Sequence, residues 1–259
     1  METRKLNPSH DTALTIFVGA SSKATNWENK ETTWSDLLNR CANTTKTKET
    51  LVQYLQMDKA KQSKIKDVGG FVGGYFATNG RRKKEGLIGR TVVTLDADNV
   101  KKDSNIWEGF KATFSFAACI YSTHKHTEEA PRLRIIIPLA DSTNVEQYEA
   151  VARYIADKIG MEYFDPTTFQ ASRLMFWPST PKDVDFFFDW QDGEILDPEE
   201  ILKKYKDWKD VSSWPMHKSE TPEAILNNKR KAPDPTAKAG IVGAFCNAYT
   251  IEEAIEKFL

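Results

Sequence analysis

Hydrophobic positions follow extended or helical spacing along much of residues 13–190, and one extended run ends in two carboxylates. This run is Arg90-Thr-Val-Val-Thr-Leu-Asp-Ala-Asp98, and its β-branched and aliphatic residues predict a buried strand. Side chains two positions apart on a strand point to the same side, about 7 Å apart. Asp96 and Asp98 therefore predict either a site for an oxygen-preferring divalent metal or an ordinary acidic turn at the end of a strand.

The rest of the pattern predicts a core of alternating strands and helices. Apolar residues at helical spacing from Asn144 to Ile159, followed by Gly160, predict the clearest helix. Capping-box sequences at Thr33 and Thr250 predict two further helix starts. The other expected elements are strands at 13–19, 114–121, 131–139, 172–177 and 184–190, helices at 48–66, 105–113 and 198–208, a polar loop at 26–33, and a strand pair around 69–80 with Asn-Gly at its turn.

The order strand, helix, strand, strand, helix, strand is that of a split β-α-β sheet of the ferredoxin or RNA-recognition type. The expected fold class is therefore α+β, with this sheet flanked by helices. Residues 1–66 are expected to pack on the core as a strand and helices, residues 67–190 to form the core, and residues 191–259 to form a linker and a small helical segment. The last helical pattern stops at the final residue, which indicates a trimmed longer chain or a partner just beyond.

Composition narrows the class of protein. A chain of 259 residues that is 40% hydrophobic and 28% charged is typical of a globular protein. No stretch approaches the ~20 apolar residues that span a bilayer, and the N-terminus has no signal-peptide core. We therefore expect a cytoplasmic protein without a membrane partner. The three cysteines are far apart, so neither a disulfide framework nor a Cys-x-x-Cys zinc site is available.

Charge is nearly balanced overall, at −1, but it is unevenly distributed. The segment from Met57 to Arg90 holds nine basic and three acidic residues, a net charge of +6. A basic segment next to an acidic strand end suits a nucleic-acid enzyme, because cations bind phosphates and carboxylates bind metal. A solvated charged helix and loop would have the same composition.

Polar clusters at three strand ends resemble, in the same order, the motifs of the archaeo-eukaryotic primase (AEP) superfamily. The matching residues are the strand ending in Asp96-Ala-Asp98, then Ser122-Thr-His124, then Phe164-Asp165. The sequence around them looks like the primase-polymerase domain of phage, prophage and plasmid replication proteins. This wider resemblance rests on residues 121–127, 131–139, 172–179, 240–246 and 249–259, and it covers roughly residues 67–259.

The resemblance implies a DNA primase-polymerase, a nucleotidyltransferase acting in the replication of phage or other mobile DNA. Two Mg²⁺ or Mn²⁺ ions about 3.5–4 Å apart would be held by Asp96, Asp98 and Asp165. The implied nucleotide contacts are Ser122, His124, His126, Arg132, Arg134 and Arg173. His124 is the first candidate for the triphosphate, and Arg134 is another because it stands where the family often has histidine. The implied DNA contacts are Arg81, Arg82, Lys83, Lys84 and Arg90. The expected partners are single-stranded or primed DNA, NTP or dNTP, and a helicase domain in a longer chain.

Three other interpretations stay open. A rolling-circle replication nickase of the HUH type would use His124 and His126 for metal and Tyr154 as nucleophile, although it gives Asp96 and Asp98 no role. A non-catalytic replication initiator would bind origin DNA with the same fold. A sugar-nucleotide transferase would use Asp-x-Asp but would leave the basic segment unexplained.

Overall fold

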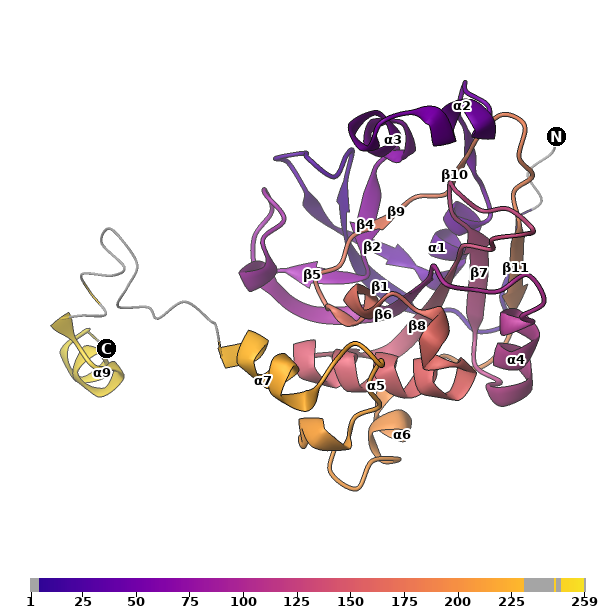
Figure 1. Ribbon diagram of the computed structural model, residues 1–259. Helices are drawn as coiled ribbons and strands as arrows, with labels where there is room; N and C mark the ends of the chain where they lie inside the picture. Colours follow the sequence, from indigo (N-terminus) through magenta and orange to yellow (C-terminus); the bar gives the residue numbers. More distant parts are fainter. Residues whose placement is uncertain (1–4, 231–244, 246–247, 259) are drawn as a thin grey trace. The chain divides into compact units, whose positions relative to one another are not determined.

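Two antiparallel sheets lie at the centre of the first of two compact units, Met1–Ser219 and Glu220–Leu259, in the computed structural model of the protein (Figure 1). The structure describes residues 5–230, 245 and 248–258. The strands are β1 Ala13–Gly19, β2 Glu28–Thr33, β3 Thr45–Lys46, β4 Gly70–Val72, β5 Gly74–Phe76, β6 Leu87–Ala97, β7 Ala118–Ser122, β8 Leu133–Thr143, β9 Met175–Phe176, β10 Ser179–Thr180 and β11 Phe188–Gln191. The larger sheet has the strand order β11-β7-β8-β6-β5, the smaller one β2-β1-β4-β9, and β3 pairs with β10 in parallel. The helices of this unit are α1 Trp34–Cys41, α2 Leu51–Gln56, α3 Lys59–Lys66, α4 Ile106–Thr113, α5 Val145–Ile159 and α6 Pro198–Leu202, with short 3-10 turns at Lys84–Gly86, Met161–Tyr163, Pro166–Phe169 and Val211–Ser213.

The larger sheet contains the predicted split β-α-β arrangement. β6, α4, β7, β8 and α5 follow one another along the chain, and β8 lies antiparallel between β6 and β7. The α+β class is thereby confirmed. Figure 1 shows α5 running beneath β6 and β8, with α6 beyond it, in agreement with the contacts between these elements.

The last strand of the predicted order does not join this sheet. β9 pairs with β4 of the smaller sheet, and β5 takes the edge beside β6. β5 pairs with β6 across the connection 77–86, which contains Asn79-Gly80, so this pairing of neighbouring segments occupies the edge that the later strand would have used. The predicted strand at 172–177 is consequently reduced to Met175–Phe176.

One hydrophobic core joins the two sheets and α1. It includes Ile16 of β1, Leu38 of α1, Val92 of β6 and Ile136 of β8, all almost fully buried. α1 begins at the predicted cap, where the Thr33 hydroxyl accepts a hydrogen bond from the Asp36 amide at 3.2 Å. Because β1 also pairs with β4, residues on both sides of position 66 share one sheet and one core.

Two predictions about the N-terminal region were wrong in detail. The expected helix at 48–66 is two helices, because Asp58 caps α3 by accepting from the Lys61 amide and so ends the α2 segment. The expected polar loop at 26–33 contains β2, which pairs with β1 along its length. β2 is an edge strand with mostly exposed side chains, so it carries no apolar alternation that would have predicted it.

The second unit contains helix α7, Pro222–Arg230, and helix α9, Ile251–Phe258. The predicted capping box at Thr250 is confirmed, since the Thr250 hydroxyl and the Glu253 carboxylate each accept the other residue's amide. Most of the 240–246 segment used for the resemblance lies outside the described residues. Within the described part of the chain, no helix has the length and apolar character needed to cross a membrane.

Candidate active site

The register of the larger sheet brings Asp96 together with an arginine. Asp96 of β6 lies directly opposite Arg134 of β8, and Arg134 lies opposite Tyr121 of β7. The Arg134 Nη2 and Nε atoms donate to Asp96 Oδ1 at 2.9 and 3.2 Å. Opposite charges on directly facing strand positions attract, so this ion pair follows from the strand pairing itself.

Arg134 is buried, and each of its three guanidinium nitrogens donates a hydrogen bond within the protein. Its Nη1 donates to the Phe176 carbonyl at 2.9 Å and to the Tyr121 hydroxyl at 3.3 Å. Burial by itself lowers the pKa of Arg134, but Asp96 and Tyr121 outweigh it and raise that pKa above its usual value. Burial also raises the pKa of Tyr121. Arg134 is therefore a permanent cation at the floor of the site.

The other two predicted carboxylates also face arginines. Asp98 Oδ1 is 2.9 Å from Arg132 Nη1, and both side chains are about one-third exposed. The backbone amide of Asp165 donates to the Asp96 carbonyl at 3.1 Å, which brings the backbones of these two residues side by side. Asp165 Oδ1 caps the 3-10 turn at Thr167, and its Oδ2 lies 3.7 Å from Arg173 Nη2.

Asp96, Asp98 and their two arginine partners line a cleft with an excess of positive charge. Its charged lining consists of two carboxylates, Asp96 and Asp98, and four cations, Lys66, Lys125, Arg132 and Arg134. Burial, followed by repulsion from Arg134, lowers the pKa of Lys66. The cleft has a volume of about 90 Å³, below the roughly 300–1,000 Å³ of sites that enclose whole ligands. In this conformation it can hold a phosphate group or an ion, while the rest of a nucleotide would lie outside.

Two of these cations, Lys66 and Lys125, were not assigned a role from the sequence. Lys66 is the last residue of α3, and its ammonium lies 5.2 Å from the Phe176 ring centroid. Lys125 follows His124 in the loop after β7. Both lie in lysine-containing stretches, but no sequence signal distinguishes them from their exposed neighbours.

His124 lies at the cleft, but both of its ring nitrogens are already engaged. Nε2 is 3.1 Å from Glu49 Oε1, and Nδ1 is 2.9 Å from Ser179 Oγ. Burial is the largest influence on the pKa of His124 and lowers it, while hydrogen bonds hold the pKa of Glu49 below its usual value despite burial. A neutral ring facing an ionised carboxylate must donate from Nε2, so Nδ1 accepts from the Ser179 hydroxyl.

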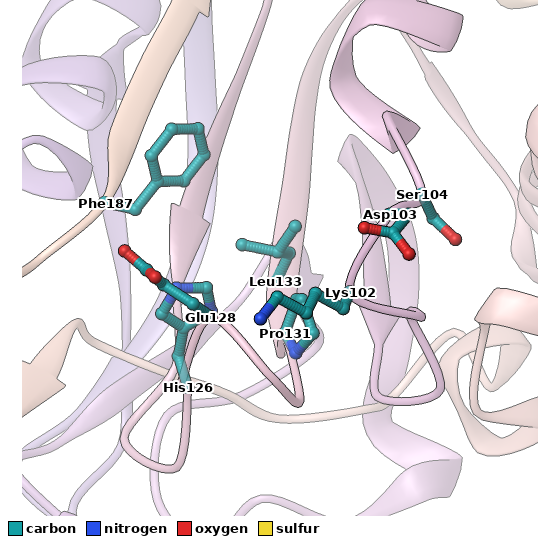
Figure 2. A pocket seen from close by; sticks show the side chains of 8 residues that line it. All are labelled: Lys102, Asp103, Ser104, His126, Glu128, Pro131, Leu133 and Phe187. Carbon is teal, nitrogen blue, oxygen red and sulfur yellow. The ribbon is translucent and has the colours of Figure 1, made fainter.

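Ser122 and His126, two of the expected nucleotide contacts, do not line the cleft. Ser122 is fully buried and its Oγ accepts from the Phe187 amide, whereas Thr123 lines the cleft. His126 lines a separate cavity of about 380 Å³, in which Figure 2 shows it beside Glu128, across from Lys102 and Asp103. Its Nδ1 accepts from the Arg132 amide, and burial lowers its pKa.

The placement of these residues gives no support to the nickase interpretation. His124 and His126 line different cavities, so they do not form a shared metal site in this conformation. Tyr154, which the nickase would use as its nucleophile, is on α5 and packs edge-on against Tyr205 with ring centroids 5.8 Å apart.

The predicted DNA contacts divide into exposed and internal residues. Arg81, Lys83 and Lys84 are exposed in the connection between β5 and β6. Arg82 is half-buried, with Nη1 donating to the Ser172 carbonyl at 3.0 Å. Arg90 is completely buried.

The buried position of Arg90 corrects the expectation that it contacts DNA. Its guanidinium donates to the carbonyls of Val92 and Ala171 and to the Thr94 hydroxyl, and it stacks over the Tyr148 ring. An arginine that is enclosed in the core cannot reach the phosphates of DNA. Its role is to tie β6 to the segment that leads to Arg173.

The acidic pair fits a divalent metal by the chemistry of its donors. No cage of three or more carboxylate, histidine or cysteine ligands is present among the residues that the structure describes. Mg²⁺ at nucleotide sites, however, uses one or two carboxylates together with substrate phosphates instead of an all-protein cage. Asp96 and Asp98 each use Oδ1 in an ion pair, and in the described residues each Oδ2 is without a hydrogen-bond partner.

The chain belongs to the VapE N-terminal domain family, which it matches over residues 1–217. No protein with curated annotation matches it. Among solved structures, it is similar to the AEP domain (PP-N190) of the Cyanophage S-2L primase-polymerase (PrimPol), with 12% sequence identity and a TM-score of 0.40. This similarity covers 74% of the present chain and 88% of that one. Similarity at this level carries no argument about the fold or the activity, so the function must be argued from the site.

Proposed function

We propose that this protein is a DNA primase-polymerase that performs template-directed nucleotidyl transfer. One observation carries the proposal: an acidic strand end, Asp96 and Asp98, shares a cleft with four cations. Carboxylates that can take a divalent metal and cations that can take a polyphosphate are the two requirements of phosphoryl transfer. When bound, the metal would lower the pKa of a 3′-hydroxyl and neutralise charge on the incoming triphosphate.

In this proposal the polyphosphate is bound mainly by Arg132 and Arg134. Planar guanidinium groups bind phosphate through two parallel hydrogen bonds, and Lys66 and Lys125 add point charges at the same cleft. His124 would act indirectly, because Glu49 and Ser179 already use both of its nitrogens. It would hold the loop that carries Lys125 and so position that lysine.

Template DNA would contact the exposed cations Arg81, Lys83 and Lys84, with Arg173 between this connection and the acidic residues. Burial is the largest cause of the lowered pKa of both Arg82 and Lys66, and the positive charge of Arg173 lowers both pKa values further. This electrostatic coupling supports a continuous basic path toward the cleft. Asp165 would join Asp96 as a metal ligand after separating from Arg173.

The test is extension of a primer on single-stranded DNA, and synthesis without a primer, using labelled nucleotides and Mn²⁺ or Mg²⁺. Products are expected with the native protein and with Tyr154→Phe, and none with Asp96→Asn or Asp98→Asn. A covalent DNA adduct that disappears in Tyr154→Phe would replace this proposal with the nickase. DNA binding without any product would favour a non-catalytic initiator.

A further inference from the structure

Each carboxylate of the proposed metal site is paired with a different arginine. The closest nitrogen–oxygen distances are 2.9 Å for Arg134 and Asp96, 2.9 Å for Arg132 and Asp98, and 3.7 Å for Arg173 and Asp165. Arg132 and Arg134 are two positions apart along the chain, and both line the cleft with the two aspartates. The protein thus supplies its own cations to the carboxylates and its own anions to the arginines.

Such pairing opposes the binding of either ligand alone. A divalent metal at Asp96 and Asp98 would lie a few ångströms from two guanidinium groups, and in a partly buried site that repulsion is weakly screened. A polyphosphate bound by Arg132 and Arg134 would likewise face two carboxylates. Only a metal and a polyphosphate arriving together would provide a new opposite charge for every group that loses its partner.

The size of the cleft leads to the same conclusion. Its volume of about 90 Å³ is bounded by the side chains that form the ion pairs. Space for several phosphate groups therefore requires the arginines to move away from the aspartates. Arg132 has fewer constraints on its movement than Arg134, because its side chain is about one-third exposed and its guanidinium pairs with the partly exposed Asp98.

We propose that Arg132 and Arg134 occupy the metal site in place of the metal until a polyphosphate draws them away, so that the cleft binds divalent metal and polyphosphate cooperatively. This inference rests on the proposed function, since it takes Asp96 and Asp98 as the metal ligands. Its consequence is that an isolated metal ion, like an isolated polyphosphate, binds weakly to the native protein.

The first experiment measures Mn²⁺ alone, by the electron paramagnetic resonance signal of the free ion, without any nucleotide. Arg132→Gln is expected to tighten Mn²⁺ binding on the order of tenfold, within the usual range of coupling between sites. Lys84→Gln is the control, because it removes the same charge at an exposed position outside the cleft. Equal or weaker Mn²⁺ binding by Arg132→Gln, compared with Lys84→Gln, would overturn the inference.

The reciprocal experiment measures inorganic tripolyphosphate alone by calorimetry. Asp98→Asn frees Arg132 and is expected to tighten tripolyphosphate binding by a similar factor, whereas the exposed Glu85→Gln, which makes the same charge change, is expected to have little effect. The two ligands are measured separately because they chelate each other in solution. An equal gain in both variants would mean that general charge, not the ion pair, controls binding.

Asp96→Asn separates this inference from the proposed function. If Mn²⁺ binding to the Arg132→Gln background is unaffected by Asp96→Asn, the carboxylates are not metal ligands and the proposed function fails with the inference. If Mn²⁺ binding depends on Asp96 but not on the presence of Arg132, the proposed function stands and only the inference that the arginines compete with the metal is refuted. Arg134→Gln is avoided as the main variant because Arg134 also donates to Phe176 and Tyr121 inside the fold.

Discussion

Replacing Asp96 or Asp98 with alanine should abolish nucleotidyl transfer in both cases but destabilise the protein to very different extents. The side chains of Asp96 and Arg134 are 14% and 7% exposed, whereas those of Asp98 and Arg132 are 32% and 36% exposed. Asp96→Ala leaves a buried guanidinium without its anion, and breaking a buried pair in this way costs about 3–5 kcal/mol. Asp98→Ala breaks a solvent-screened pair, which contributes about 0–1 kcal/mol.

The assay is denaturant unfolding followed by circular dichroism, with thermal unfolding as a second readout. For a unit of this size the expected fall in Tm is roughly 6–20 °C for Asp96→Ala and less than about 4 °C for Asp98→Ala. The small loss in Asp98→Ala should shrink further at high salt, while the loss in Asp96→Ala should persist. Adding Arg134→Met to Asp96→Ala should recover part of the stability, because the unpaired buried charge is removed with its partner.

Equal destabilisation by the two alanine variants would refute this reasoning. So would a cost below about 1 kcal/mol for Asp96→Ala, since a pair of that size behaves as an exposed one. Either result would mean that Arg134 can reach water once Asp96 is gone, and that the buried pair does not form the floor of the cleft.

Four further predictions follow from the structure. Arg90→Leu should lower the free energy of unfolding by about 1–3 kcal/mol or more, because it leaves buried carbonyls without a donor, and it should not weaken DNA binding. Lys84→Ala should weaken single-stranded DNA binding and reduce its salt dependence without affecting stability, as fluorescence anisotropy across a salt series would measure. Thr168→Val removes the hydroxyl that accepts from the Asp96 amide at 2.8 Å, so it should slow nucleotide transfer and cost about 1–3 kcal/mol in urea unfolding. Burial lowers the pKa of His124, which is buried, and of His126, which is half-buried. The unfolded chain therefore binds more protons, and stability should fall as pH drops from about 6.5 through the lowered pKa values. The double variant with glutamine at both positions should show a shallower slope in unfolding measured from about pH 5 to pH 7.

Local patterns in the sequence predicted many of the elements correctly. The apolar spacing and the Asn144 cap predicted α5, and the β-branched run before Asp96 predicted β6. Such features depend on residues a few positions apart, so they can be identified without knowing the fold. Where a partner strand decided the outcome, as for β2 and β9, local patterns gave the wrong structure or the wrong sheet.

Burial separated residues that look alike in the sequence. Arg90 and Lys84 belong to the same basic segment, yet Arg90 is enclosed by the core and Lys84 is exposed. His124 and His126 are two positions apart but line different cavities. Counting charges or matching short motifs cannot make these distinctions, because they depend on what packs around each side chain.

The sequence by itself determined that two aspartates stand at the end of a buried strand, close to basic residues and in the order of a known set of motifs. Only the tertiary structure decided that Arg134, 38 residues further along the chain, is the partner of Asp96 and that Arg132 is the partner of Asp98. The physical reason is the register between β6 and β8, which is set by the burial of the whole sheet and not by the residues of the site.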